Sequence, residues 1–134
     1  MWREAESEVV RLTKVLAHND MSGEALFHKF QTASREDVRL AAALRGYFTP
    51  GCGDEAQRQQ YLSYLCRRVR PAAWALMEEN RVLDLEAFAQ KADFSPALVD
   101  EFLDKAIELK RPEVLVWLLE EKKQFGFRDR DFSL

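Results

Sequence analysis

The sequence predicts an all-α fold of about eight short helices arranged in antiparallel hairpins. Apolar residues recur at helical spacing along most of the 134 residues, and no stretch shows sustained apolar–polar alternation. The chain contains only five Gly and four Pro, so breaks between elements are few. With 47% apolar and 32% charged residues, the composition is typical of a globular protein and not of a disordered one.

Three helices are expected in the first 48 residues. The first covers about residues 2–18, because apolar side chains recur every three or four positions there. Ser22 is a suitable N-cap for a short second helix. Residues 34–37 (Ser-Arg-Glu-Asp) resemble a capping box that opens the third helix. In that helix Ala42 and Ala43 would let a neighbouring element approach closely.

The stretch at residues 49–53 (Thr-Pro-Gly-Cys-Gly) is rich in Pro and Gly and predicts a loop. We treat it as an internal boundary between an N-terminal helical unit, residues 1–48, and two two-helix repeats within residues 54–124. A C-terminal tail follows at residues 125–134, where the last helix is expected to end at Gly126. All these parts are expected to form a single domain, residues 1–134, because this length suits one domain with its own core.

Five further helices are predicted after the loop. Asp54 caps the first, Pro71 begins the second and Asp84 caps the third. The last two form a hairpin over residues 95–123, in which Ser95 is the N-cap of one helix and Pro112 opens the other. The first hairpin helix carries one apolar stripe, which we expect to be buried: Val99, Phe102, Leu103, Ala106 and Ile107.

The second hairpin helix contains Glu-Val-Leu-Val-Trp-Leu-Leu-Glu-Glu-Lys at residues 113–122, preceded by Ala106 and Ile107. This pattern resembles the second half of an ankyrin repeat, where an Ala-Ala pair precedes Glu-Ile-Val and a Leu-Leu run. Phe102 and Asp104 depart from it, since they replace the Pro and His of the family motif. The resemblance implies a degenerate ankyrin-like or HEAT-like repeat, and hence a binding scaffold and not a catalyst.

A weak internal sequence repeat favours a solenoid-like array. Shifting the chain by 41 residues places Arg70-Pro71 on Arg111-Pro112 and Tyr61-Leu62 on Phe102-Leu103. A period near 40 residues is typical of two-helix repeats such as HEAT. Two apolar helices also share such a pattern by chance, so both interpretations stay open here.

Net charge, apolar run length and cysteine content argue against several classes of protein, among them membrane-spanning and secreted ones. The net charge of −3 gives no global attraction to nucleic acid or anionic lipid. The longest apolar run, residues 114–119, is far too short for a membrane span, and the first residues lack the apolar segment of a signal peptide. Cys52 and Cys66 make no disulfide framework, so we expect a reducing, cytoplasmic setting.

The sequence contains no recognised catalytic motif. His18 and His28 have no acidic partner at a recognised spacing, and no His-Glu-x-x-His or Cys-x-x-Cys pattern occurs. Cys52 lies between two glycines and could be an exposed thiol, but a catalytic cysteine needs a base, for which only the two histidines could serve. We therefore predict no enzyme, no cofactor and no metal site.

Large aromatic residues are the candidate contacts for a protein partner. Trp74 and Trp117 occupy similar places in the two repeats, where they either pack in the core or anchor a partner. The tail adds Phe125, Phe127 and Phe132, which either cover the last helix or form a docking peptide.

The sequence thus predicts a non-enzymatic protein-interaction module of the helical-repeat type, which binds a protein segment or associates with itself as a homodimer. The alternative is a small nucleic-acid-associated regulator. That alternative would use the densest basic cluster in the chain, Arg58, Arg67, Arg68 and Arg70, near two tyrosines.

Overall fold

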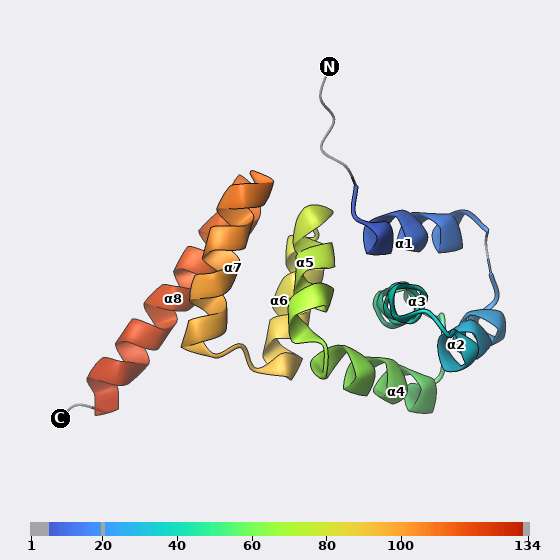
Figure 1. Ribbon diagram of the computed structural model, residues 1–134. Helices are drawn as coiled ribbons and strands as arrows, with labels where there is room; N and C mark the ends of the chain where they lie inside the picture. The colour runs from blue at the N-terminus through green and yellow to red at the C-terminus, as the bar shows by residue number, and fades with distance from the viewer. Residues whose placement is uncertain (1–5, 20, 133–134) are drawn as a thin grey trace, which may run out of the picture. The chain divides into compact units, whose positions relative to one another are not determined.

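The computed structural model describes residues 6–19 and 21–132, with side chains described as far as Phe125 (Figure 1). This part of the chain holds eight α-helices and no strand, which confirms the predicted all-α class. The helices are α1 (Glu8–His18), α2 (Gly23–Thr32), α3 (Glu36–Phe48), α4 (Glu55–Cys66), α5 (Val69–Glu78), α6 (Val82–Ala92), α7 (Pro96–Leu109) and α8 (Pro112–Phe132).

The chain forms two compact units, Met1–Ala75 and Leu76–Leu134, which divide within α5. Residues 49–53 do form a loop between α3 and α4, as the sequence predicts. The units do not divide at that loop, however, because α4 packs back against α3 and so belongs to the first unit. A Pro/Gly-rich loop marks a break in secondary structure, and packing decides where a compact unit ends.

The first unit is built around α3, against which α1, α2 and α4 all pack. The middle of α3 is buried from residue 40 to residue 44, and its three consecutive alanines have no exposed surface. Small side chains allow three neighbours to approach one helix at the same time, as the sequence suggested for Ala42 and Ala43. This helix is therefore the core of the first unit.

Four aromatic rings fill the space between α2 and α4. The Tyr61 ring lies edge-on to Phe27 and Phe30, with centroids 5.6 and 5.0 Å away, and Phe30 meets the Tyr64 ring at 5.3 Å. Tyr61 also presses on α3, where a Cβ added to Gly46 would lie 2.4 Å from its ring. Burial raises the pKa of Tyr61 to about 12. A side chain at position 46 therefore cannot be accommodated without moving this ring.

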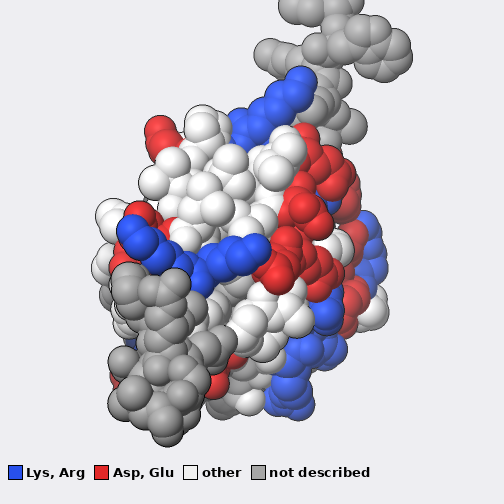
Figure 2. Space-filling model, turned by 90° about the vertical axis from the view of Figure 1, so that its left-hand side faces the viewer, with Lys and Arg blue, Asp and Glu red and all other residues white. Residues whose placement is uncertain are grey.

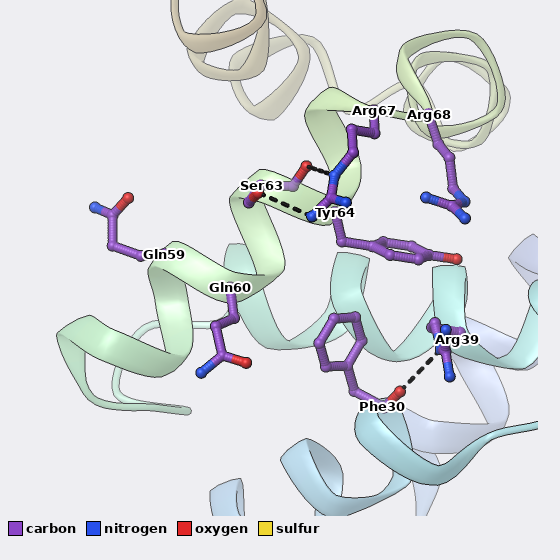
Figure 3. A pocket seen from close by; sticks show the side chains of 8 residues that line it. All are labelled: Phe30, Arg39, Gln59, Gln60, Ser63, Tyr64, Arg67 and Arg68. Carbon is purple, nitrogen blue, oxygen red and sulfur yellow. Dashed lines mark hydrogen bonds between the residues drawn. The ribbon is translucent and has the colours of Figure 1, made fainter.

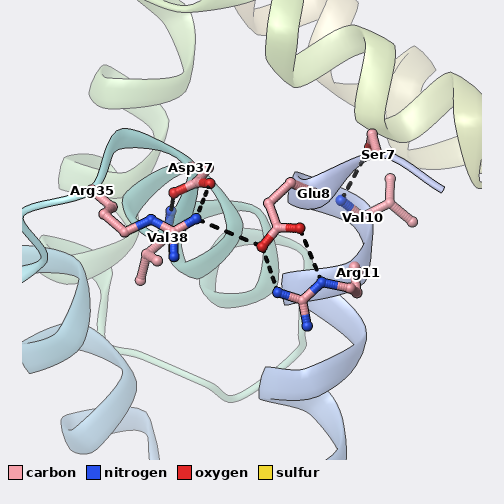
Figure 4. Close-up of polar contacts among 7 residues, drawn as sticks. All are labelled: Ser7, Glu8, Val10, Arg11, Arg35, Asp37 and Val38. Atoms are coloured by element: carbon pink, nitrogen blue, oxygen red, sulfur yellow. Dashed lines mark hydrogen bonds and ion pairs between the residues drawn. The ribbon is translucent and has the colours of Figure 1, made fainter. Parts of the chain in front are cut away.

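Charged side chains join the N-terminal ends of α1 and α3 (Figure 4). Arg35 lies 2.6 Å from a carboxylate oxygen of Asp37 and 3.6 Å from one of Glu8. Glu8 also accepts two hydrogen bonds from the Arg11 guanidinium, and these bonds lower its pKa. All four side chains are exposed in part, so this link adds little stability.

Several predicted helix starts were wrong by a few residues. Ser7 caps α1, accepting a hydrogen bond from the Val10 N–H, so that helix begins at Glu8 and not near residue 2. Arg35 is the N-cap of α3, and no side chain closes the capping box expected at residues 34–37. Helix α5 begins two residues before Pro71, and α6 begins two residues before Asp84.

Other predicted caps are confirmed. Asp54 and Gln57 form a complete capping box at α4, and Ser22 and Ser95 each accept a hydrogen bond from a backbone N–H of the helix that follows. Local side-chain chemistry predicts these starts because only nearby residues take part. Among the wrong starts, α5 and α6 begin earlier than their local signals indicate, whereas α1 begins later, after its serine cap.

The second unit contains the predicted hairpin, in which α7 and α8 pack along each other. Helix α7 ends at Lys110, which has the left-handed backbone conformation, and Pro112 then begins α8 as predicted. Arg111 connects this turn to the end of α5, because its guanidinium donates hydrogen bonds of 3.0 and 2.8 Å to the carbonyl of Glu78.

Helix α8 is longer than the sequence suggested. It continues through Gly126 to Phe132, so the stretch expected to be a separate tail is helical. A glycine inside a helix lowers the stability of that helix by about 1 kcal/mol relative to alanine. A penalty of this size does not by itself end a helix. Residues 126–132 therefore continue α8.

Candidate functional sites on the two units

Three large apolar side chains on the α7–α8 hairpin remain exposed. Ile107 is 61% exposed, Val116 61% and Leu119 51%. We call these three residues the hairpin face. The sequence prediction that Ile107 is buried was wrong, whereas the other four members of its stripe are buried. Ile107 lies at the edge of that stripe, where α8 does not cover it.

One ion pair places two members of the hairpin face, Ile107 and Leu119, on the same side of the two helices. The Lys122 ammonium of α8 is 2.9 Å from a carboxylate oxygen of Asp100 on α7. Seven residues make two helical turns, so Asp100 and Ile107 point the same way from α7. Leu119 precedes Lys122 by three residues, close to one turn of α8. The ion pair therefore brings these two apolar side chains to the same side.

Charges of opposite sign flank this face. Asp100, Asp104 and Glu108 recur every four residues and form an exposed acidic stripe along α7. Lys122 and Lys123 are exposed on α8. Figure 2, which views the molecule from the side of α7 and α8, shows an uncharged area beside a row of acidic side chains, with basic side chains at its border. Exposed charges of both signs thus lie on the two helices that carry the hairpin face.

The predicted aromatic anchors do not assemble on the hairpin face. Trp74 belongs to the first unit and Trp117 to the second, and both are half-buried. Trp117 follows Val116 directly, so helical geometry points it about 100° away from that side chain. Phe125 is half-buried beside a cavity of about 160 Å³ near Phe94. The side chains of Phe127 and Phe132 lie outside the described part of the chain.

The first unit carries a different site, a hollow of about 390 Å³ between α2, α3 and α4 (Figure 3). We call it the arginine pocket, because three guanidinium groups contribute to its wall. Its lining consists of Phe30, Arg39, Gln59, Gln60, Ser63, Tyr64, Arg67 and Arg68. None of these lining residues is acidic.

Neighbouring groups hold two of the three arginines in place. Arg39 donates to carbonyls at the end of α2, with distances of 3.2 Å to Phe30 and 3.1 Å to Ala33. Arg67 donates to the carbonyl and hydroxyl oxygens of Ser63, one turn earlier, at 3.4 and 3.2 Å. Figure 3 shows Arg39 on one side of the Tyr64 ring and Arg68 on the other.

Arg68 is fixed by two contacts of its own. Its guanidinium carbon lies 4.1 Å from the centroid of the Tyr64 ring, and its Nε donates to a Glu36 carboxylate oxygen. The Tyr64 hydroxyl donates to the same oxygen at 2.5 Å. This hydroxyl contact, followed by that of Arg68, lowers the pKa of Glu36, while burial and the carboxylate raise the pKa of Tyr64. The Glu36 carboxylate at the start of α3 thereby holds Tyr64 and Arg68, which lie at the end of α4 and just after it.

The structure brings together only two of the four arginines predicted as a nucleic-acid patch. Arg67 and Arg68 line the pocket, whereas Arg58 donates to the Tyr47 carbonyl at 2.8 Å and stacks on the Tyr47 ring. Arg70 is exposed but does not line the pocket. Arg39 was missed, because it lies on another helix about thirty residues earlier and no local pattern links it to α4.

Two further kinds of site are absent from the described residues. Within these, no group of three or more His, Cys, Asp and Glu side chains is placed to hold a metal ion. No helix among them is both long enough and apolar enough to cross a bilayer. Cys52 and Cys66 are free thiols, and burial raises the pKa of Cys66.

Comparisons of the chain with family models, curated proteins and solved structures found no match. The ankyrin-like or HEAT-like interpretation therefore stays a prediction. Any function has to be inferred from the hairpin face and the arginine pocket themselves.

Proposed function

We propose that this protein is a non-enzymatic protein-interaction module of the helical-repeat type, and that the hairpin face binds a second copy of the chain. The observation that carries this proposal is the exposure of Ile107, Val116 and Leu119 next to the buried interior of the same hairpin. Large apolar side chains that stay exposed beside charged residues are typical of protein-binding surfaces.

Charge favours a second copy as the partner. The acidic stripe lies on α7 and the lysines at residues 122 and 123 lie on α8, so each copy carries both signs on the helices of the hairpin face. In a two-fold dimer each copy would therefore present charges of both signs to the other. Such an interface is isologous, which means that the same patch serves both partners.

The area of the hairpin face predicts a weak complex. Each of its three side chains is already partly covered, so completing their burial contributes about 1–1.5 kcal/mol per residue. The total is smaller than the free energy that association costs in lost motion. Neighbouring apolar surface and the charge pairs must supply the rest. We therefore expect a reversible dimer with a dissociation constant in the micromolar range or above.

The spacing of two helix starts supports the repeat part of the proposal. Helices α4 and α7 begin 41 residues apart, at Glu55 and Pro96, the same interval as the internal sequence repeat. Each start has a side-chain N-cap, Asp54 in one case and Ser95 in the other. The nucleic-acid alternative has less support, because the arginines it needs are separated and the chain is acidic overall.

Sedimentation velocity on the full chain, from about 1 µM to several hundred µM, tests the proposal. We expect the mean mass to rise with concentration for the natural protein and to stay monomeric for Leu119→Lys. The matched control is Leu83→Lys, since Leu83 is 80% exposed and belongs to α6, outside the α7–α8 hairpin. A natural protein that stays monomeric throughout, or an equal loss of association in both variants, would contradict the proposal.

A further inference from the structure

The arginine pocket has no role in the proposed dimer, because it lies in the first unit, whereas the hairpin face belongs to the second. We propose that it binds a phosphate monoester, carried as a phosphorylated side chain on a peptide. Three features of the pocket support this ligand: its charge, the fixed position of its arginines and its opening to solvent.

Charge favours a group with two negative charges. Arg39, Arg67 and Arg68 each carry one positive charge, and Glu36, which is bonded to Arg68, offsets one of them. The remaining charge of +2 matches a phosphate monoester, which carries close to two negative charges at neutral pH. A carboxylate or a phosphodiester carries only one and would leave the pocket positively charged.

Fixed guanidinium groups reduce the cost of binding. Arg39 is held by the carbonyls at the end of α2, and Arg68 by Glu36 and the Tyr64 ring. An arginine has five N–H donors, and the bonds to described residues use only part of this set. A ligand therefore meets donors that are already oriented, and loses less affinity to the ordering of side chains.

The shape of the pocket suits the end of a side chain. Gln59, Gln60, Ser63 and Arg67 are exposed, so the hollow opens to solvent along α4. Their amide and hydroxyl groups add neutral donors beside the guanidinium groups. The floor consists of Phe30 and Tyr64, which are nearly buried. A phosphate and its short stem can enter this space, while the peptide that carries them remains on the surface.

The experiment is calorimetric titration of the full chain with a short, end-blocked, neutral peptide that contains one phosphoserine. The same peptide with serine and with glutamate provides the comparison. We expect saturable binding of the phosphopeptide, no binding of the serine peptide, and binding of the glutamate peptide weaker by about tenfold or more.

Two arginine variants locate the binding site. Arg67→Gln should weaken phosphopeptide binding by about tenfold or more, since it removes a charged donor of the pocket. Arg70→Gln is the matched control, because it makes the same change of charge three residues later on an exposed side chain that does not line the pocket. It should alter the affinity by less than about twofold. The described bonds of Arg67 reach only Ser63, one turn earlier, so Arg67→Gln should keep the melting temperature, which is measured for both variants.

Four outcomes would overturn the proposal. The first is the absence of saturable phosphopeptide binding, and the second is an equal loss of affinity in Arg67→Gln and Arg70→Gln. The third is tighter binding of an oligothymidylate, with the steep salt dependence of a phosphodiester strand, which would favour nucleic acid instead. The fourth is binding to phosphatidic-acid vesicles without binding to the peptide.

The two proposals in this molecule can fail independently. Leu119→Lys, which should abolish the dimer, should leave phosphopeptide binding unchanged. Arg67→Gln should leave the concentration dependence of the mass unchanged. A loss of both properties in either variant would indicate misfolding, which the melting temperature would reveal.

Discussion

Helices α3 and α8 both contain an uninterrupted apolar run, yet the two runs have different surroundings. In α3, residues 40–44 are all buried, with α1, α2 and α4 packed against that helix. In α8, residues 114–119 include two fully buried side chains, Val114 and Leu118, and two that are more than half exposed, Val116 and Leu119. An apolar run therefore predicts a helix, but the number of neighbouring helices decides whether the whole run is buried.

Side-chain size explains part of this difference. The run in α3 is Leu-Ala-Ala-Ala-Leu, and its three alanines let neighbours approach from several directions. The run in α8 is Val-Leu-Val-Trp-Leu-Leu, whose larger side chains hold neighbours further away. Six successive residues also point in every direction around a helix, so α7 and α6, which pack against α8, do not cover them all. The uncovered part is available to another molecule.

The sharpest test of this comparison uses two adjacent leucines of α8. Leu118→Ala should lower the free energy of unfolding by about 2–5 kcal/mol, because it leaves a cavity in the hairpin. Leu119→Ala should cost less than about 1 kcal/mol, since about half of that side chain is already in water. Urea unfolding at a concentration where the chain is monomeric measures both. Equal losses would show that the hairpin face is not an exposed surface in solution.

The crowding around α3 can be tested with one methyl group. Gly46→Ala should destabilise the protein by about 1–3 kcal/mol, although alanine favours helices, because the new Cβ would meet the Tyr61 ring. The control is Gly53→Ala, where the nearest atom is the end of the flexible Gln57 side chain, and the loss should stay under about 1 kcal/mol. Thermal unfolding of both variants measures the effect. A neutral Gly46→Ala would mean that α3 and α4 are less tightly packed than described.

Two serines near helix starts test whether a local side-chain cap contributes to stability. The expected effects are smaller than those above. Ser95→Ala should lower the stability by about 1 kcal/mol, since the serine accepts a hydrogen bond from the Leu98 N–H at 3.2 Å. Ser34→Ala should be close to neutral, because Arg35 is the N-cap of α3. Denaturant unfolding distinguishes the two. An equal loss at both serines would instead support the capping box that the sequence suggested at residues 34–37.

The smallest expected effect concerns Glu36, whose carboxylate accepts hydrogen bonds from Tyr64 and Arg68 in the first unit. Glu36 has a lowered pKa in the folded chain, so its contribution is present above the unfolded value near 4.5 and is lost as the pH falls through the folded value. Glu36→Gln should therefore cost about 0.5–1 kcal/mol at pH 7, discounted because the carboxylate is largely exposed. The deficit relative to the natural protein should shrink towards pH 3.

Urea unfolding of both proteins at the two pH values measures this change. The same substitution made in an Arg68→Gln background should cost less, because one of the two contacts of the carboxylate is already lost. A deficit that stays constant or grows on acidification would contradict the described role of Glu36.

Much of the fold could be predicted because its signals are local. The all-α class, the caps at Ser22, Asp54 and Ser95, and the start of α8 at Pro112 all follow from residues within one or two helical turns. The candidate sites could not be predicted in the same way. Arg39 on α3 and Arg68 just after α4 line the same pocket, and the sequence contains no spacing that links them. Ile107 fits a helical stripe, and only the position of α8 shows that it is uncovered.

The sequence by itself determined the helical class of this protein, the starts of α2, α4, α7 and α8, and most of the buried side of α7. It could do so because capping bonds and apolar periodicity act between residues close along the chain. Only the tertiary structure decided which apolar side chains stay in water, which arginines converge and where the compact units divide. Those properties depend on which helices meet in space, and that pairing reflects many weak contacts between residues far apart in the sequence.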